Sequence, residues 1–166
     1  MILNMVRKLF SGTVYVRISE DRLRVHHLEN GSVFDQPPLI AVDASNPRKV
    51  TLRAIGDEAQ GLEAQSGVTV SNPFSHPRLL VSNFRNAEWV LRHAIRAVHP
   101  AQFVTPSPVV IMHPLEKLEG GLTDIECRVF RELALGAGAR QVHLHVGEAL
   151  SPNHFTWDQI RSPDEQ

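Results

Sequence analysis

The sequence predicts an α/β fold, and three observations carry this prediction. Apolar and polar residues alternate near the N-terminus, which is typical of half-buried strands. Apolar residues recur at three- and four-residue spacing over residues 87–98, which indicates an amphipathic helix, and the apolar run at 109–112 indicates a buried strand. Of the 166 residues, 42% are hydrophobic and 21% are charged, so the chain can build one globular core.

The first elements are predicted to be three strands. Alternating apolar residues favour strands at 14–18 and 23–28, separated by a tight turn. The dipeptide Asn30-Gly31 is a strong hairpin signal, and it leads into a third strand at 32–34.

The middle of the chain mixes short elements with one clear helix. Residues 57–64 favour a short helix, and residues 66–77, rich in Gly, Ser, Asn and Pro, favour a loop or edge strand. The helix at 87–98 is expected to end at His99-Pro100, because proline cannot continue it.

A second helix and a last strand follow the buried strand. Thr123 and Glu126 have the spacing of a capping box, in which threonine caps the helix and glutamate lies three residues on. Gly136 and Gly138 are expected to close this helix before a strand at 141–146. A dinucleotide-binding loop would have its glycines after a strand and before a helix, so these glycines do not predict one.

Composition excludes several classes of function. The net charge is −1 and no basic cluster follows the N-terminus, so no nucleic-acid partner is expected. Cys127 is the single cysteine, which excludes an intramolecular disulfide and favours a reducing, cytoplasmic compartment. No stretch approaches the roughly 20 apolar residues that span a bilayer.

The first twelve residues have an amphipathic pattern. If helical, they form a wide apolar face opposite Arg7 and Lys8, which is the layout of an interfacial membrane anchor. A frayed terminus or a helix packed on the domain are the alternatives. The face is made of Ile2, Leu3, Met5, Val6, Leu9 and Phe10.

The nine histidines raise the question of a metal site. His143 and His145 would point to the same side of a strand. No carboxylate or cysteine lies at a recognisable ligand spacing from them, so we expect an interface or half-buried pair and predict no metal.

Several motifs resemble the MreB family of bacterial actin-like proteins. Residues 54–59 follow the family's Ala-Val-Gly-x-Glu-Ala stretch, and residues 126–144 follow its most specific signature, ending in Ala-Gly-Ala-Arg-x-Val-x-Leu. Gln36-Pro37-Pro38 stands where the family has Glu-Pro-Ser before an apolar strand. The resemblance runs from about Phe10 to Ala149 and covers the N-terminal half of the family.

The resemblance implies half of an actin-like (ribonuclease H-like) fold. It has a mixed β-sheet flanked by helices and a small appended subdomain at about 43–80. The implied organisation is a membrane-binding segment at 1–12, an actin-like domain at 13–150 and a C-terminal tail at 151–166.

The resemblance also implies which parts of a nucleotide site are missing. The family's first phosphate loop, Asp-Leu-Gly-Thr, becomes Val16-Arg17-Ile18-Ser19 and loses its acid and its glycine. The chain supplies no second phosphate loop, so no cofactor and no catalytic residue are expected. Glu126 falls on the family's water-orienting glutamate, and its capping role is enough to explain it.

The resemblance therefore implies a non-catalytic accessory of the cell-shape cytoskeleton. Its expected partners are an MreB-type filament, another copy of itself, or the inner membrane surface, with Phe103 and Val104 as a second membrane contact. The alternatives are half of a split ATPase completed by a partner chain, or a degenerate actin-fold binding module. The longer loop at 115–122 is either a contact surface or a tolerated extension.

Overall fold

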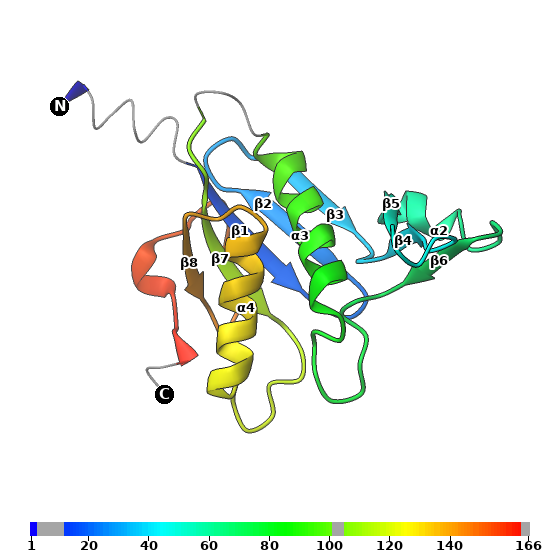
Figure 1. The fold of residues 1–166 in the computed structure, drawn as a ribbon. Helices are drawn as coiled ribbons and strands as arrows, with labels where there is room; N and C mark the ends of the chain where they lie inside the picture. Colours follow the sequence, from blue (N-terminus) through cyan, green and yellow to red (C-terminus); the bar gives the residue numbers. More distant parts are fainter. Residues whose placement is uncertain (3–11, 101–104, 164–166) are drawn as a thin grey trace.

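The fold is built on a five-stranded sheet, seen in a computed structural model that describes residues 1–2, 12–100 and 105–163 (Figure 1). The strand order is β3-β2-β1-β7-β8. β1 pairs antiparallel with β2 and parallel with β7, so the sheet is mixed. The strands are β1 (Thr13–Ile18), β2 (Leu23–His27), β3 (Val33–Gln36), β7 (Val109–Pro114) and β8 (Gln141–Leu144).

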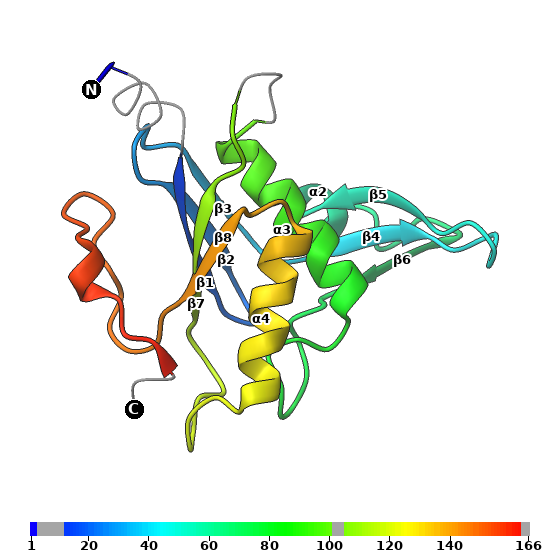
Figure 2. The same ribbon diagram turned by 60° about the vertical axis from the view of Figure 1, so that its left-hand side comes forward.

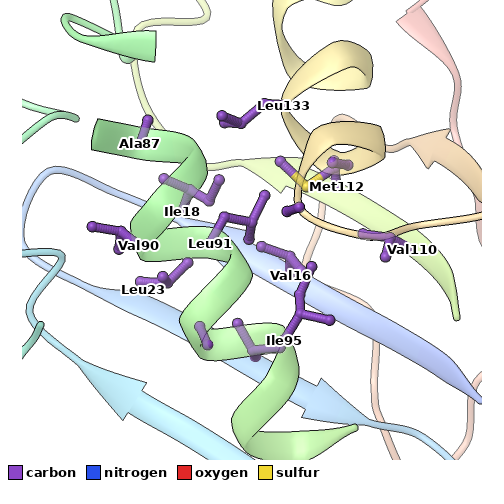
Figure 3. Packing of buried hydrophobic residues seen from close by; sticks show 14 of the residues in the cluster. Val16, Ile18, Leu23, Ala87, Val90, Leu91, Ile95, Val110, Met112 and Leu133 are labelled. Carbon is purple, nitrogen blue, oxygen red and sulfur yellow. The ribbon is translucent and has the colours of Figure 1, made fainter. Parts of the chain in front are cut away.

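Two helices cover one face of this sheet, α3 (Phe84–Val98) and α4 (Asp124–Gly136). Side chains of β1 and β7 point toward them, with Val16, Ile18 and Met112 fully buried (Figure 3). From α3, Leu91 and Ile95 fill the space above the central strands. The period-two pattern of the strands and the helical spacing of α3 thus meet in one core, as the sequence predicts.

The helix ends also follow the sequence. The side chain of Asn83 accepts a hydrogen bond from the backbone N–H of Asn86 and caps α3, which ends at Val98 before His99-Pro100. α4 ends at Gly136, and Gly138 has a φ of 115°. Such a backbone favours glycine, so the prediction that these glycines close a helix is confirmed.

A small three-stranded sheet lies next to α3 and the β3 side of the large sheet (Figure 1). Its order is β5-β4-β6, with β4 at Ile40–Asp43, β5 at Thr51–Ile55 and β6 at Val68–Ser71. β6 is therefore an edge strand, one of the two predictions for residues 66–77. The adjoining helix α2 spans only Asp57–Gln60, because Gly61 begins a series of turns where the sequence predicts helix up to residue 64.

Among the described residues, no helix of comparable length covers the second face of the large sheet. Residues 147–163 cross it instead, and they include only the short 3₁₀ turn η1 (Trp157–Gln159) (Figure 2). Leu150 packs there against Tyr15 and Ile111. Residues 151–163, the described part of the segment expected as a tail, lie against the sheet, where Phe155 and Ile160 pack on the same cluster.

No helix among the described residues is long and apolar enough to cross a membrane. Of the expected membrane residues, Ile2 is described and is 76% exposed. The others lie outside the described residues: Leu3, Val6, Leu9, Phe10, Phe103 and Val104.

Candidate functional site at the carboxyl ends of β1 and β7

The first part of the site is the turn that follows β1. The N–H of Ser19 donates to the carbonyl of Arg22 at 2.9 Å, and the Ser19 hydroxyl accepts from the N–H of Arg22 at 3.1 Å. The serine side chain thus closes a tight turn between β1 and β2, as the sequence predicts. Val16 and Ile18 point into the core, so they present no polar group to a ligand.

A carboxylate from another loop already occupies this turn. The backbone N–H of Glu20 donates to Oε2 of Glu116 at 2.8 Å. Glu116 lies just after β7, and β1 and β7 are parallel, so their carboxyl ends lie at the same edge of the sheet. A backbone N–H beyond β1 is the kind of donor that a phosphate loop presents to its ligand.

Lys117 ties the same loop to Glu20. Its Nζ lies 3.3 Å from Oε2 of Glu20 and also donates to the carbonyl of His76. Lys117 has a φ of 58°, which is uncommon for a residue other than glycine. Hydrogen bonds from Ser75 and Lys117 lower the pKa of Glu20, so this carboxylate is held ionised.

The 115–122 loop is therefore an ordered part of the site. It contacts the β1–β2 turn through Glu116 and Lys117, and Lys117 reaches the segment that follows β6. The side-chain amide of Asn72 donates to the carbonyl of Glu20 at 2.7 Å and completes the link. Three segments that are distant in sequence meet at this end of the sheet.

Glu126 is engaged at the start of α4. Its Oε2 accepts from the N–H and from the hydroxyl of Thr123, both at 2.8 Å, while the N–H of Glu126 lies 3.3 Å from the Thr123 hydroxyl. Both halves of the predicted capping box are present. The carboxylate thus binds backbone and side chain of its own helix N-terminus.

An apolar hollow of about 360 Å³ opens beside Glu126. Glu116, Lys117 and Glu126 lie at its polar part. Two of its apolar residues are exposed, Ile125 at 77% and Leu79 at 45%. The apolar lining is Leu79, Leu80, Val81, Leu122, Ile125, Val129 and Phe130.

The two histidines considered for a metal have separate neighbours. His143 packs against Trp157 with ring centroids 5.2 Å apart. His145 lies beyond β8, is buried, accepts from the N–H of Arg161 and contacts the carbonyl of Glu148. Within the described part of the chain, no three potential metal ligands come together.

Sequence reasoning missed a polar network on the second face. The Tyr15 hydroxyl accepts from the N–H of Leu150 at 3.1 Å and lies 2.7 Å from Nδ1 of His113. His113 Nε2 donates to the carbonyl of Gly147 at 3.1 Å. Tyr15 alternates with core residues of β1, so the sequence predicts that its side chain points to the second face of the sheet. The contact between Tyr15 and His113 depends on the pairing of β1 with β7, which the sequence does not predict.

The fold defines an actin-like half-domain in which a turn closed by Ser19 follows β1. The family model described as MreB/Mbl protein matches residues 16–150. The chain therefore belongs to the MreB/Mbl family.

Curated relatives support this assignment. The cell shape-determining protein MreB of Haemophilus influenzae is 26% identical over 87% of this chain, and that of Escherichia coli K12 is 28% identical over 86%. The chain spans 40% of the length of each of these relatives. It is also 34% identical to the uncharacterized protein YjaA of Escherichia coli K12, over 54% of this chain and 76% of YjaA.

Solved structures show the same fold. MreB5 of Spiroplasma citri bound to ADP superposes with a TM-score of 0.64 over 82% of this chain and 38% of that protein, at 15% identity. A non-polymerising mutant of MamK bound to AMPPNP gives a TM-score of 0.63 at 12% identity, over 82% of this chain and 41% of MamK. The MamK double helical filament gives 0.57 at 13% identity, over 81% of this chain and 40% of that chain. The actin-like fold expected from the sequence is confirmed.

Proposed function

We propose that this chain is a non-catalytic member of the MreB/Mbl family that binds an MreB-type filament or a second copy of itself. One observation carries the non-catalytic part of the proposal. The Glu116 carboxylate accepts the N–H of Glu20, the donor that a phosphate would need beyond β1. Residues 19–22, which form the turn, include no glycine.

The negative charges at this edge of the sheet also disfavour the binding of a nucleotide phosphate. Glu20 and Glu116 put two carboxylates at the turn, and Lys117 pairs with Glu20. Like charges placed a few ångströms apart repel each other. A triphosphate placed at this turn would meet that repulsion.

The apolar hollow supports the binding part of the proposal. Its exposed residues Leu79 and Ile125 form a concave apolar surface at the edge of the domain. The chain spans 40% of the MreB relatives it matches, and a structural neighbour is a double helical filament. We propose an MreB-type subunit as the occupant, with an interface above roughly 1,000 Å².

Calorimetry with ATP and Mg²⁺ tests the non-catalytic part. We expect no heat of binding, because the turn is closed by Ser19 and Glu116. Micromolar binding, equivalent to about −8 kcal/mol, would overturn it.

Co-sedimentation with purified MreB filaments, together with sedimentation velocity of the chain alone, tests the binding part. Ile125→Ser should reduce either association, because it places a hydroxyl in the apolar hollow. Leu135→Ser is the matched control, since Leu135 is 45% exposed on the same helix but lies outside the hollow. A strict monomer that does not co-sediment would contradict this part.

A split ATPase is the second candidate, and the position of Glu126 favours it. Glu126 lies at the mouth of the hollow, where a partner chain could reach it. Hydrolysis that appears only with a partner chain and disappears in Glu126→Ala would support this candidate. A degenerate actin-fold module would bind neither ATP nor filaments.

The proposed location is the cytoplasmic side of the inner membrane. The amphipathic pattern of residues 1–12 and the apolar pair Phe103 and Val104 support peripheral membrane binding.

A further inference from the structure

The second face of the large sheet is only partly covered. Residues 147–163 pack over β1, β7 and β8, as Leu150 does on Tyr15 and Ile111 (Figure 2). Over β1, β2 and β3 the face opens into a hollow of about 440 Å³, with Pro152 and Asn153 of the C-terminal segment at its rim. This hollow is separate from the site at the carboxyl ends of β1 and β7.

The strand register lines this hollow with a row of charged residues. Asp35 of β3 lies opposite Arg24 of β2, and Arg24 lies opposite Arg17 of β1. Two arginines directly opposite each other repel, so the row is destabilising unless an anion lies between them. The single carboxylate of the row is Asp35.

Other arginines already form ion pairs with Asp35, although its buried Oδ1 has no hydrogen-bond partner in the described part of the chain. Arg24 Nη2 lies 2.8 Å from its Oδ2, and Arg22 Nε lies 3.0 Å from its Oδ1. Arg22, Arg24 and Asp35 therefore form a cluster with a charge of +1, and Arg17 raises the local charge to +2.

Asp35 acts on Arg17 electrostatically, but no carboxylate among the described residues lies within ion-pair distance of Arg17. Its Nη2 lies 3.2 Å from Nδ1 of His26, and its guanidinium carbon lies 5.3 Å from the centre of the Tyr15 ring. Its Nε is buried and has no hydrogen-bond partner in the part of the chain that the structure describes. An unpaired buried donor on a charged group costs free energy.

The neighbouring imidazoles leave this charge unchanged, because both rings are neutral near pH 7. Burial, together with the charges of Arg17 and Arg24, lowers the pKa of His26, so its Nδ1 accepts from Arg17 as a neutral ring. Burial also lowers the pKa of His113, the next residue in the row, to about 4. The hollow is therefore positive at neutral pH.

We propose that this hollow binds a small molecule through an oxyanion group, a phosphate or a carboxylate, that pairs with Arg17. The planar guanidinium matches both groups, because two N–H donors can face two oxygens. The volume lies within the range of about 300–1,000 Å³ that is usual for small-molecule sites. The oxyanion would also separate Arg17 from Arg24.

The test follows the backbone amide signals of β1 and β2 in every variant, and the Nε–H signal of Arg17 in wild type, by two-dimensional NMR. Inorganic phosphate and acetate are titrated in parallel at constant ionic strength, which distinguishes the two oxyanions. We expect a saturable shift of the Arg17 signal with at least one of them. Arg17→Gln should weaken the saturable binding at least tenfold.

Arg53→Gln is the matched control, because it removes the same charge from β5, where Arg53 faces Asp43 at 3.9 Å. It should leave binding unchanged. Equal binding by wild type and Arg17→Gln, or shifts that stay linear in both ligands, would overturn the proposal. If Arg17→Gln fails to fold, Arg17→Lys replaces it in the test. Lysine keeps the positive charge but lacks the two parallel N–H donors of the guanidinium, so it should still weaken binding.

Discussion

Nε2 of His27 lies 3.0 Å from Nδ1 of His99, and the two rings stack with centroids 5.2 Å apart. His99 Nε2 donates in turn to the carbonyl of Pro106 at 2.9 Å. The N–H of Asn30 donates to Nδ1 of His27, which leaves Nε2 of His27 to donate to His99. The pair joins the end of β2 to the end of α3, and both rings are buried.

Gly12 is expected to be intolerant of a side chain, because it packs against this pair. A Cβ atom at Gly12 would lie 2.3 Å from His27 Nε2 and 2.7 Å from His99 Nδ1. Gly12→Ala should lower the free energy of unfolding by about 1–3 kcal/mol in urea titration. Gly61→Ala is the control, since its nearest neighbour would lie at 3.5 Å. Equal stability of the two variants would contradict this expectation.

The capping box of α4 predicts how much substitutions at Thr123 and Glu126 destabilise the protein. Thr123→Ala removes the hydroxyl on which Glu126 depends and should destabilise the protein by about 1 kcal/mol. Glu126→Ala should also destabilise it, whereas Glu126→Gln keeps an acceptor for the N–H of Thr123 and should cost less. Thermal unfolding of the three variants measures the order. A Glu126→Gln variant as unstable as Glu126→Ala would show that charge, and not capping, matters there.

Lowering the pH is expected to destabilise the folded protein because of His113. Burial, with His145 adding to it, lowers the pKa of His113 from 6.5 to about 4. Between these values the unfolded chain binds more protons than the folded one, so the free energy of unfolding decreases as the pH falls from 6.5 toward 4. The loss from this group should be about 2 kcal/mol at pH 5.

Urea titrations at pH 7.5 and pH 5 measure this loss. His113→Gln should show a smaller loss than wild type, although its stability at pH 7.5 is lower. His154→Gln, at an exposed position, should keep the pH dependence of wild type. A His113→Gln variant with the full loss would assign the effect to other groups.

Membrane binding should depend on the first ten residues. Each apolar side chain that leaves water contributes about 1.5–3 kcal/mol, and Arg7 and Lys8 add about 1 kcal/mol each on anionic lipid. In flotation with anionic vesicles, the fraction of protein bound to the vesicles should be highest for wild type, lower for Phe103→Ser and lowest for a variant lacking residues 1–10. High salt should weaken the recovery. Equal recovery of wild type and the truncated protein would refute the anchor.

The sequence predicts local elements well and their long-range partners poorly. Val16 and Ile18 alternate with polar residues, and this pattern alone places them on the core side of β1. The pairing of β1 with β7 has no local signal, so the meeting of Glu20 with Glu116 required the structure. The family resemblance predicted the fold class and the mixed sheet, but not which strands pair.

The site itself was predicted in part. The tight turn after β1 follows from the two alternating apolar segments that flank it, and the capping box of Glu126 follows from its spacing to Thr123. The side chain that fills the turn comes from the 115–122 loop, whose backbone includes Lys117 in an uncommon conformation. Such a conformation is set by tertiary contacts, and the sequence carried no turn motif for it.

The position of β1 in the strand order has a consequence for synthesis on the ribosome. β1 pairs with β2 soon after both emerge, but its other neighbour, β7, begins at Val109. The small sheet, contiguous over residues 40–71, can close first because its contacts are local. Until residue 114 leaves the exit tunnel, the nascent chain carries an open strand edge at Thr13–Ile18, which is where chaperones or aggregation would act.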